Sequence, residues 1–125
     1  MRLVVEATDY EEAVRFFRDA LGLPEELAVS GPGGAEVTIL QAGRATLELA
    51  NPAQRRYIDE VEVGRQVAPR LRVAFEVADS AAAADRLREA GATLVAPPVE
   101  TPWRSLNARL DVPAGLQVTL FQELD

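Results

Sequence analysis

The sequence contains no cysteine and no histidine. The lack of cysteine excludes disulfides, thiolate nucleophiles and Cys-bound zinc. The lack of histidine removes both the commonest metal ligand and the commonest general base. Only carboxylates, hydroxyls, amides and backbone groups remain as ligands, and these suit hard cations better than zinc.

Long apolar runs are also missing, since no stretch approaches the roughly 20 residues that cross a bilayer. Met1 leads directly into a strand-like segment, which leaves no room for a signal peptide, so a cytoplasmic location is expected. The net charge of −7 argues against nucleic acid and anionic membranes as partners. It favours solubility and, mildly, cationic partners.

What is present is an ordinary globular composition. The chain has 125 residues, of which 48% are apolar and 26% charged. This length is typical of one domain and is enough to bury roughly two-thirds of the unfolded chain's surface. We therefore expect a single domain over residues 1–125 with its own core.

The chain repeats itself at a shift of 70 residues. Two helix signals, "TDYEEAVRFFRDALGLP" and "ADSAAAADRLREAGA", begin at the N-cap residues Asp9 and Asp79 and end near glycines. The same shift pairs Phe17 with Leu87 on the apolar stripe, and it pairs the strand-like segments that precede the helices. The sequence therefore predicts two copies of one unit.

Three strand-like runs follow each helix. They cover 25–30, 35–41 and 44–50 in the first half and 93–96, 103–111 and 116–122 in the second. Each unit thus reads as βαβββ, with the first over residues 1–50 and the second over 70–125. Residues 51–69 form a connector punctuated by Pro52, Gly64 and Pro69, and we expect a loop or lid there. The fold class is α+β.

Strand residues alternate between the two faces of a sheet. The apolar set needs the apolar helix stripes against it, so the helices should cover one face only. The opposite face collects charged side chains: Arg2, Glu6, Glu48, Arg72, Glu76 and Arg109. This face is either a solvated side of an antiparallel sheet or the lining of a binding site.

Several of these segments resemble the vicinal oxygen chelate superfamily, the glyoxalase / bleomycin resistance protein / extradiol dioxygenase group. The resemblance lies in "ATDYEEAVRFFRDALGL", "VADSAAAADRLREAGATLV" and "TPWRSLNARLDVPAGLQVTLFQ". It implies curled mixed sheets with helices on the outer face and a U-shaped trough inside. The last segment departs from the family pattern, with Arg104 in place of a glycine and Ala114 in the final turn.

Metal-using members of this superfamily place one ligand on the first and fourth strand of each unit. By resemblance those positions are Arg2, Glu48, Arg72 and Thr119 in this chain. A guanidinium is a pure donor that stays protonated, so neither arginine can be a ligand. We therefore expect no metal and no other cofactor, and metal-dependent lyase or dioxygenase activity is disfavoured.

Two interpretations of the altered positions remain open. Arg2 and Arg72 could pair with Glu48 as a salt-bridge plug in a site that binds nothing. Alternatively the face still binds a ligand, with an arginine free for a carboxylate or enolate-like group and aromatic side chains as flat walls. The ligand-binding candidates are Arg2, Glu48, Tyr57, Arg72, Trp103, Asn107, Arg109, Thr119 and Phe121.

Two classes of function follow. The first is a metal-independent binding protein of the bleomycin-resistance type that sequesters a planar or charged metabolite or antibiotic. The second is an enzyme in which Glu48 abstracts a proton while Arg2 or Arg72 stabilises an oxyanion. The acidic segment 57–65 is either a charged rim or a solvated loop. Open sheet edges indicate a homodimer, and the resemblance implies the same, since family members of this size usually pair. The pairing could build the trough across two chains.

Overall fold

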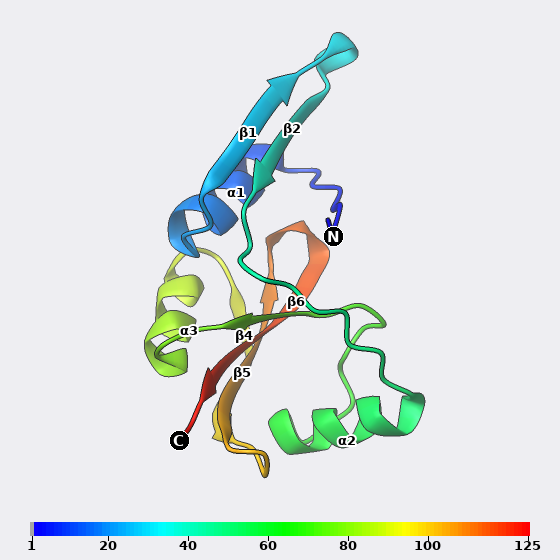
Figure 1. Cartoon of the computed structure of the whole chain (residues 1–125), viewed down its shortest axis with the longest axis vertical. Helices are drawn as coiled ribbons and strands as arrows, with labels where there is room; N and C mark the ends of the chain where they lie inside the picture. The colour runs from blue at the N-terminus through cyan, green and yellow to red at the C-terminus, as the bar shows by residue number, and fades with distance from the viewer. Residues whose placement is uncertain (1) are drawn as a thin grey trace.

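The computed structural model describes residues 2–125 and contains a two-stranded and a four-stranded sheet (Figure 1). In the larger sheet the order is β3-β6-β5-β4, with β3 parallel to β6 and the other pairs antiparallel. Its strands are β3 (Val73–Glu76), β4 (Thr93–Glu100), β5 (Ser105–Val112) and β6 (Leu116–Glu123). The smaller sheet is the hairpin of β1 (Glu25–Ser30) and β2 (Glu36–Leu40), which projects from the rest of the molecule (Figure 1).

The second half of the chain forms the predicted βαβββ unit. Its helix, α3 (Ser80–Glu89), begins where the carboxylate of Asp79 accepts a hydrogen bond from the backbone N–H of Ala82 (3.0 Å). It ends before Gly91, whose φ of 116° suits glycine alone. The mixed sheet of the expected α+β fold is therefore present in this half.

The first predicted helix also begins at its expected cap. Asp9 accepts from Glu12 N–H at 3.1 Å, and α1 (Tyr10–Val14) continues as a π-helical segment, η1 (Arg15–Ala20). The wider turn is visible in the hydrogen bond from Leu21 N–H to the carbonyl of Phe16, at 2.9 Å. The winding leaves Phe16 buried toward the large sheet.

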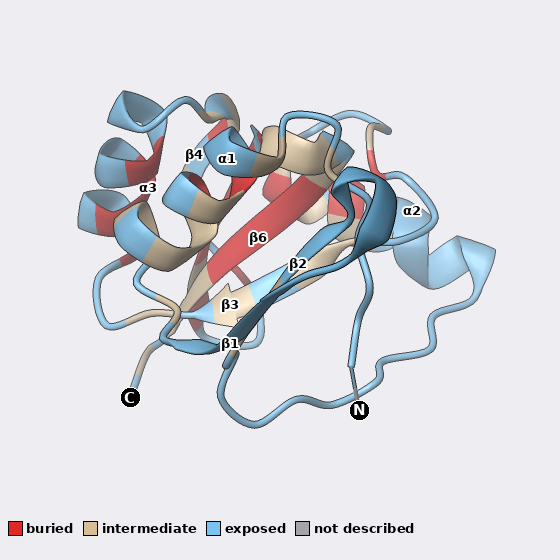
Figure 2. Ribbon diagram, turned by 90° about the horizontal axis from the view of Figure 1, so that it is seen from above, coloured by how far each residue is buried: buried red, intermediate tan, exposed pale blue. Residues whose placement is uncertain are grey.

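The core lies between the two helices and the large sheet. Figure 2 shows α1 and α3 over the buried strand β6. The apolar side chains of β5 and β6 alternate toward these helices, as the sequence predicted. The fully buried members of this core are Phe16, Ala83, Ala84, Leu87, Ala108, Leu110, Val118 and Leu120.

The connector is not a loop in its first part. Residues 52–62 form α2 (Pro52–Glu62), so the prediction of an irregular 51–69 segment was wrong there. Asn51 caps the helix by accepting from Gln54 N–H at 2.9 Å, and Pro52 occupies the first turn, where a missing N–H costs nothing. This helix packs on the polar face of the sheet, opposite α1 and α3, so the prediction that helices cover one face only was wrong.

The first half does not form the predicted unit on its own. Residues 2–7 and 44–50 were expected as strands and contain none, and only the β1–β2 hairpin forms. Apolar and polar residues do alternate in these segments. A strand also needs a neighbouring strand that hydrogen-bonds its backbone N–H and C=O groups. Most of both segments is exposed, with Leu47 at 71% and Leu49 at 87%. Within residues 2–125, no helix has the length and apolar character to span a membrane.

Candidate functional site

The polar face of β5 and β6 carries a buried set of side chains. Antiparallel pairing puts Arg109 beside Thr119, and Asn107 beside Phe121. Asn107, Arg109 and Thr119 are all buried, and so is Gln117, two residues before Thr119 in β6. Burial of so many polar groups requires that each finds partners, and α2 supplies them.

Arg109 is the centre of this network. Its Nη1 donates to Asp59 Oδ1 at 2.8 Å and to Gln117 Oε1 at 2.9 Å. Its Nη2 and Nε donate to the same oxygen of Glu62, Oε1, at 2.8 and 3.3 Å. None of the guanidinium is exposed, so it is a buried cation compensated by two carboxylates.

Glu62 reaches two further side chains on the sheet. Asn107 Nδ2 donates to Glu62 Oε2 at 2.9 Å, and Thr119 Oγ1 lies at 3.5 Å from Oε1. Asp59 and Glu62 are three residues apart, so they project from the same face of α2. That spacing lets one helix neutralise one arginine from two sides.

Asp59 also fixes the segment that follows α2. Its Oδ2 accepts from the backbone N–H groups of Val67 (2.7 Å) and Ala68 (2.8 Å). Burial acts to raise the pKa of Asp59, but hydrogen bonds from Ala68, Arg109 and Val67 outweigh burial and hold the pKa below its ordinary value. The carboxylate therefore stays ionised inside the fold.

Arg72 lies beside this network without a counterion of its own. It is half-buried, just before β3, and its Nη1 donates to Thr119 Oγ1. Within residues 2–125 no carboxylate lies at ion-pair distance from Arg72. Burial, followed by the charge of Arg109, lowers the pKa of Arg72 from its ordinary value, and these two causes outweigh the opposing charges of Glu62, Glu48 and Asp59.

The aromatic candidates occupy a different place. Tyr57 of α2 and Trp103 have ring centroids 6.3 Å apart in a tilted arrangement, and each is about half-exposed. Trp103 lies just before the start of β5, where Ser105 pairs with Glu123 at the C-terminal end of β6. Arg72 lies just before β3, whose first residue, Val73, pairs with Val118 nearer the N-terminal end of β6. The aromatic pair and Arg72 therefore lie toward different ends of β6.

The structure brings together four of the candidates predicted from sequence: Arg72, Asn107, Arg109 and Thr119. Arg2 and Glu48 lie in exposed segments and make no hydrogen bond or ion pair within the described chain. Phe121 is half-buried next to Asn107, whose Oδ1 is buried without a hydrogen-bond partner in the part of the chain that the structure describes.

Sequence reasoning missed Asp59, Glu62 and Gln117. A signal for the first two existed, because Asn51-Pro52 is a helix start and a helix over the following residues aligns Arg55, Asp59 and Glu62 on one face. Instead, 57–65 was interpreted as a charged rim or solvated loop. Two of its acidic side chains are in fact among the most buried polar groups of the fold.

The residues present do not fit a metal ion. Arg72 donates directly to Thr119, so the side chains at two of the four metal-ligand positions implied by the superfamily bind each other. Across residues 2–125, no cluster of three or more Asp, Glu, His or Cys side chains could hold a metal. The nearby carboxylates Asp59 and Glu62 are committed to Arg109. We therefore derive no step that uses a metal.

A mixed sheet with α1 and α3 packed on its apolar face and charged side chains on the other defines a small α+β domain. The chain belongs to the glyoxalase-like domain family, whose model matches residues 2–121. It is thereby a member of the glyoxalase/bleomycin resistance/dioxygenase superfamily. A search of functionally curated proteins finds no match.

Solved structures of similar proteins agree on the fold. A superfamily member from Sphaerobacter thermophilus DSM 20745 is 22% identical, with a TM-score of 0.56 and 98% of each chain covered. A family enzyme from Burkholderia phytofirmans PsJN is 16% identical, with a TM-score of 0.60 and coverage of 93% of this chain and 91% of its own. A glyoxalase-related enzyme from Fulvimarina pelagi is 18% identical, with a TM-score of 0.58 and coverage of 98% and 89%. At these identities the similarity shows the fold alone.

Proposed function

We propose that the protein binds a small organic anion, without a metal, on the polar face of its large sheet, and so sequesters a planar or charged metabolite or antibiotic. The observation that carries this proposal is Arg72, a half-buried guanidinium with no carboxylate partner within the described chain. A buried charge is costly unless it is paired. A ligand carboxylate or enolate-like group would supply the missing partner.

The division of charge between the two arginines supports this choice. Both carboxylates of α2 face Arg109 and use its donors, while Arg72 is seen to use one donor, toward Thr119. A guanidinium has five N–H donors in a planar fork that matches a carboxylate in bidentate fashion. The remaining donors of Arg72 make no hydrogen bond within residues 2–125 and are therefore available to a ligand carboxylate.

The salt-bridge plug expected as the alternative has a counterpart in the structure, but a different one. The plug is formed by Arg109, Asp59 and Glu62 rather than by Arg2, Arg72 and Glu48. It closes the middle of the polar face beneath α2. The proposed binding region is accordingly the part beside β3, where Arg72 and Thr119 lie.

Proton abstraction by Glu48 gains no support from these positions. Glu48 is exposed in a segment without regular structure. Its charge acts on Arg72, but no hydrogen bond or ion pair within residues 2–125 joins it to an arginine. Binding, rather than catalysis, is the function that the arrangement of charges favours.

We also propose that the protein works as a homodimer. Residues 2–7 and 44–50 keep the alternation of strands but have no ladder in the described chain, and β3 has a neighbour on one side only. Exposed apolar strand segments and open edges are templates for pairing with another chain. A second copy offers the same segments and edges, so the contact can close with two-fold symmetry.

The test of ligand binding is a thermal-shift screen of planar and aliphatic organic acids on the wild type and on Arg72→Met. We expect at least one acid to raise the melting temperature of the wild type and to leave that of Arg72→Met unchanged. Arg70→Met is the matched control, because Arg70 is an exposed arginine two residues away. Equal shifts in wild type and Arg72→Met, or no shift with any acid, would contradict the proposal.

A further inference from the structure

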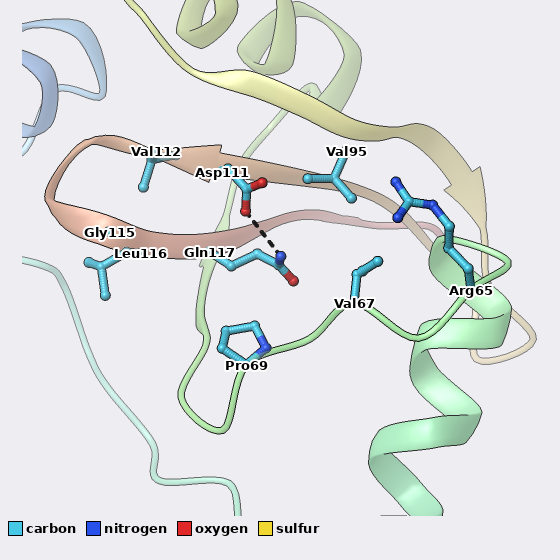
Figure 3. Close-up of a pocket in the computed structure, with 9 residues that line it drawn as sticks. All are labelled: Arg65, Val67, Pro69, Val95, Asp111, Val112, Gly115, Leu116 and Gln117. Carbon is cyan, nitrogen blue, oxygen red and sulfur yellow. Dashed lines mark hydrogen bonds between the residues drawn. The ribbon is translucent and has the colours of Figure 1, made fainter.

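A hollow of about 450 Å³ lies at the end of the polar face, between the segment that follows α2 and the β5–β6 turn (Figure 3). Its volume is within the range of about 300–1,000 Å³ that small-molecule sites occupy. Arg72 does not line it, and neither does any other residue of the region proposed above. The hollow is therefore separate from that region.

Two opposite charges face this hollow. Arg65 extends over it from the segment after α2, and Asp111 projects into it from β5 (Figure 3). They do not pair with each other, and neither belongs to an ion pair within residues 2–125. A cation and an anion separated across a hollow can be bridged by a molecule that carries both charges.

The walls are held by the buried network. Gln117 Nε2 donates to Asp111 Oδ1 at 3.1 Å, while the Oε1 of the same amide accepts from Arg109. On the other side, Asp59 holds Val67 and Ala68 through their backbone N–H groups. Because both walls are tied to the Arg109–Asp59 pair, the hollow is formed before a ligand arrives.

The rest of the lining is mainly apolar. Val67, Pro69, Val95 and Leu116 line the hollow, with Val95 between Asp111 and Arg65 and Leu116 on the far side of Asp111 (Figure 3). An apolar body would bury surface against them, at roughly 25 cal/mol per Å² removed from water. A simple anion would meet the carboxylate of Asp111, and a simple cation would meet the guanidinium of Arg65.

We propose that this hollow binds a zwitterion of the α-amino-acid type with an apolar side chain. The ligand carboxylate pairs with Arg65, its ammonium group pairs with Asp111, and its side chain packs on the apolar lining of the hollow. This second site shares no residue with the anion-binding region at Arg72.

The test compares three probes by isothermal titration or by NMR line shifts. L-Leucine carries both charges, 4-methylpentanoate lacks the ammonium group and 3-methylbutylamine lacks the carboxylate. We expect leucine to bind in the millimolar range and each analogue to bind at least about tenfold more weakly, which is about 1.4 kcal/mol. Equal binding of all three, or no leucine binding at about 10 mM, would overturn the proposal.

Two variants locate the contacts. Arg65→Met and Asp111→Asn should each weaken leucine binding by about tenfold or more. Arg56→Met and Glu89→Gln are the matched controls, since both residues are exposed and lie outside the hollow. Arg72→Met should bind leucine as the wild type does. If Arg65→Met and Asp111→Asn bind leucine unchanged, the assignment of this hollow is wrong.

Discussion

Arg109 of β5 and Asp59 of α2 form an ion pair of 2.8 Å in which neither side chain is exposed to solvent. Fifty positions separate the two residues along the chain. Because an unpaired buried charge is far more costly than a paired one, this contact commits α2 to the polar face of the sheet. The same contact fixes the walls on which both proposed binding regions depend.

Arg109→Met should destabilise the protein strongly. The substitution leaves Asp59 and Glu62 buried without their cation, and losing one partner of a buried pair costs about 3–5 kcal/mol. The measurement is urea denaturation followed by circular dichroism. Arg88→Met removes an exposed arginine that pairs with Asp85 at 3.7 Å, and we expect it to change the free energy of unfolding by less than about 1 kcal/mol. Similar losses in the two variants would contradict this view of Arg109.

Lowering the pH should release α2 from the sheet, because protonation of Asp59 removes its interactions with Arg109 and the backbone. Burial pushes the pKa of Asp59 up, but the hydrogen bonds from Ala68, Arg109 and Val67 prevail and lower it. The stabilisation is therefore complete above the ordinary aspartate pKa of about 3.9 and is lost as the pH falls through the lower pKa of the folded state. The only tryptophan, Trp103, contacts Tyr57 of α2, so its fluorescence should report the transition below about pH 4.

Asp59→Asn separates this effect from general acid unfolding. The variant should be less stable near neutral pH, and it should lose the part of the acid transition that comes from Asp59. Asp85→Asn, at an exposed position on α3, should titrate as the wild type does. An unchanged transition in Asp59→Asn would show that another group controls the release of α2.

The β5–β6 turn stores backbone strain at Ala114. Its φ of 71° is in the left-handed region, which costs an L-residue with a Cβ roughly 1–2 kcal/mol. Ala114→Gly should therefore raise the free energy of unfolding by up to about 1 kcal/mol, after allowance for the entropy of glycine in the unfolded chain. Gly115→Ala should do the reverse, since Gly115 has a φ of 69° and no crowding around its missing side chain. Thermal denaturation of both variants checks the sign.

Self-association should depend on the exposed strand segments. Leu49 is 87% exposed in a segment with alternating apolar residues, and a charge there would be unfavourable in a strand–strand contact. We expect the wild type to sediment as a dimer and Leu49→Glu to sediment as a monomer with α3 intact by circular dichroism. A wild-type monomer at micromolar concentration would rule out the proposed homodimer.

The second half of the fold was predictable because its signals are local. Asp79 and Gly91 mark the ends of a helix, and the alternation in β5 and β6 assigns each side chain to a face. The first half was not, because the same alternation at residues 2–7 and 44–50 says nothing about whether a partner strand is present. The predicted helix cap at Asp9 is confirmed, because its signal is as local as that of Asp79.

Only the part of the candidate site that belongs to the sheet was predictable. Arg72, Asn107, Arg109 and Thr119 followed from strand alternation and resemblance. Alternation cannot say what covers a face, so the carboxylates of α2 were missed. Pro52 was interpreted as a loop residue, although after Asn51 it is equally a helix start.

The most direct test is the metal content of the purified protein after incubation with zinc, iron, nickel and manganese salts and removal of free ions. If Arg72 stands where a superfamily metal would be held, inductively coupled plasma mass spectrometry should find no stoichiometric metal, while an organic acid still raises the melting temperature in the presence of a chelator. One bound ion per chain, lost together with ligand binding on chelation, would contradict the account.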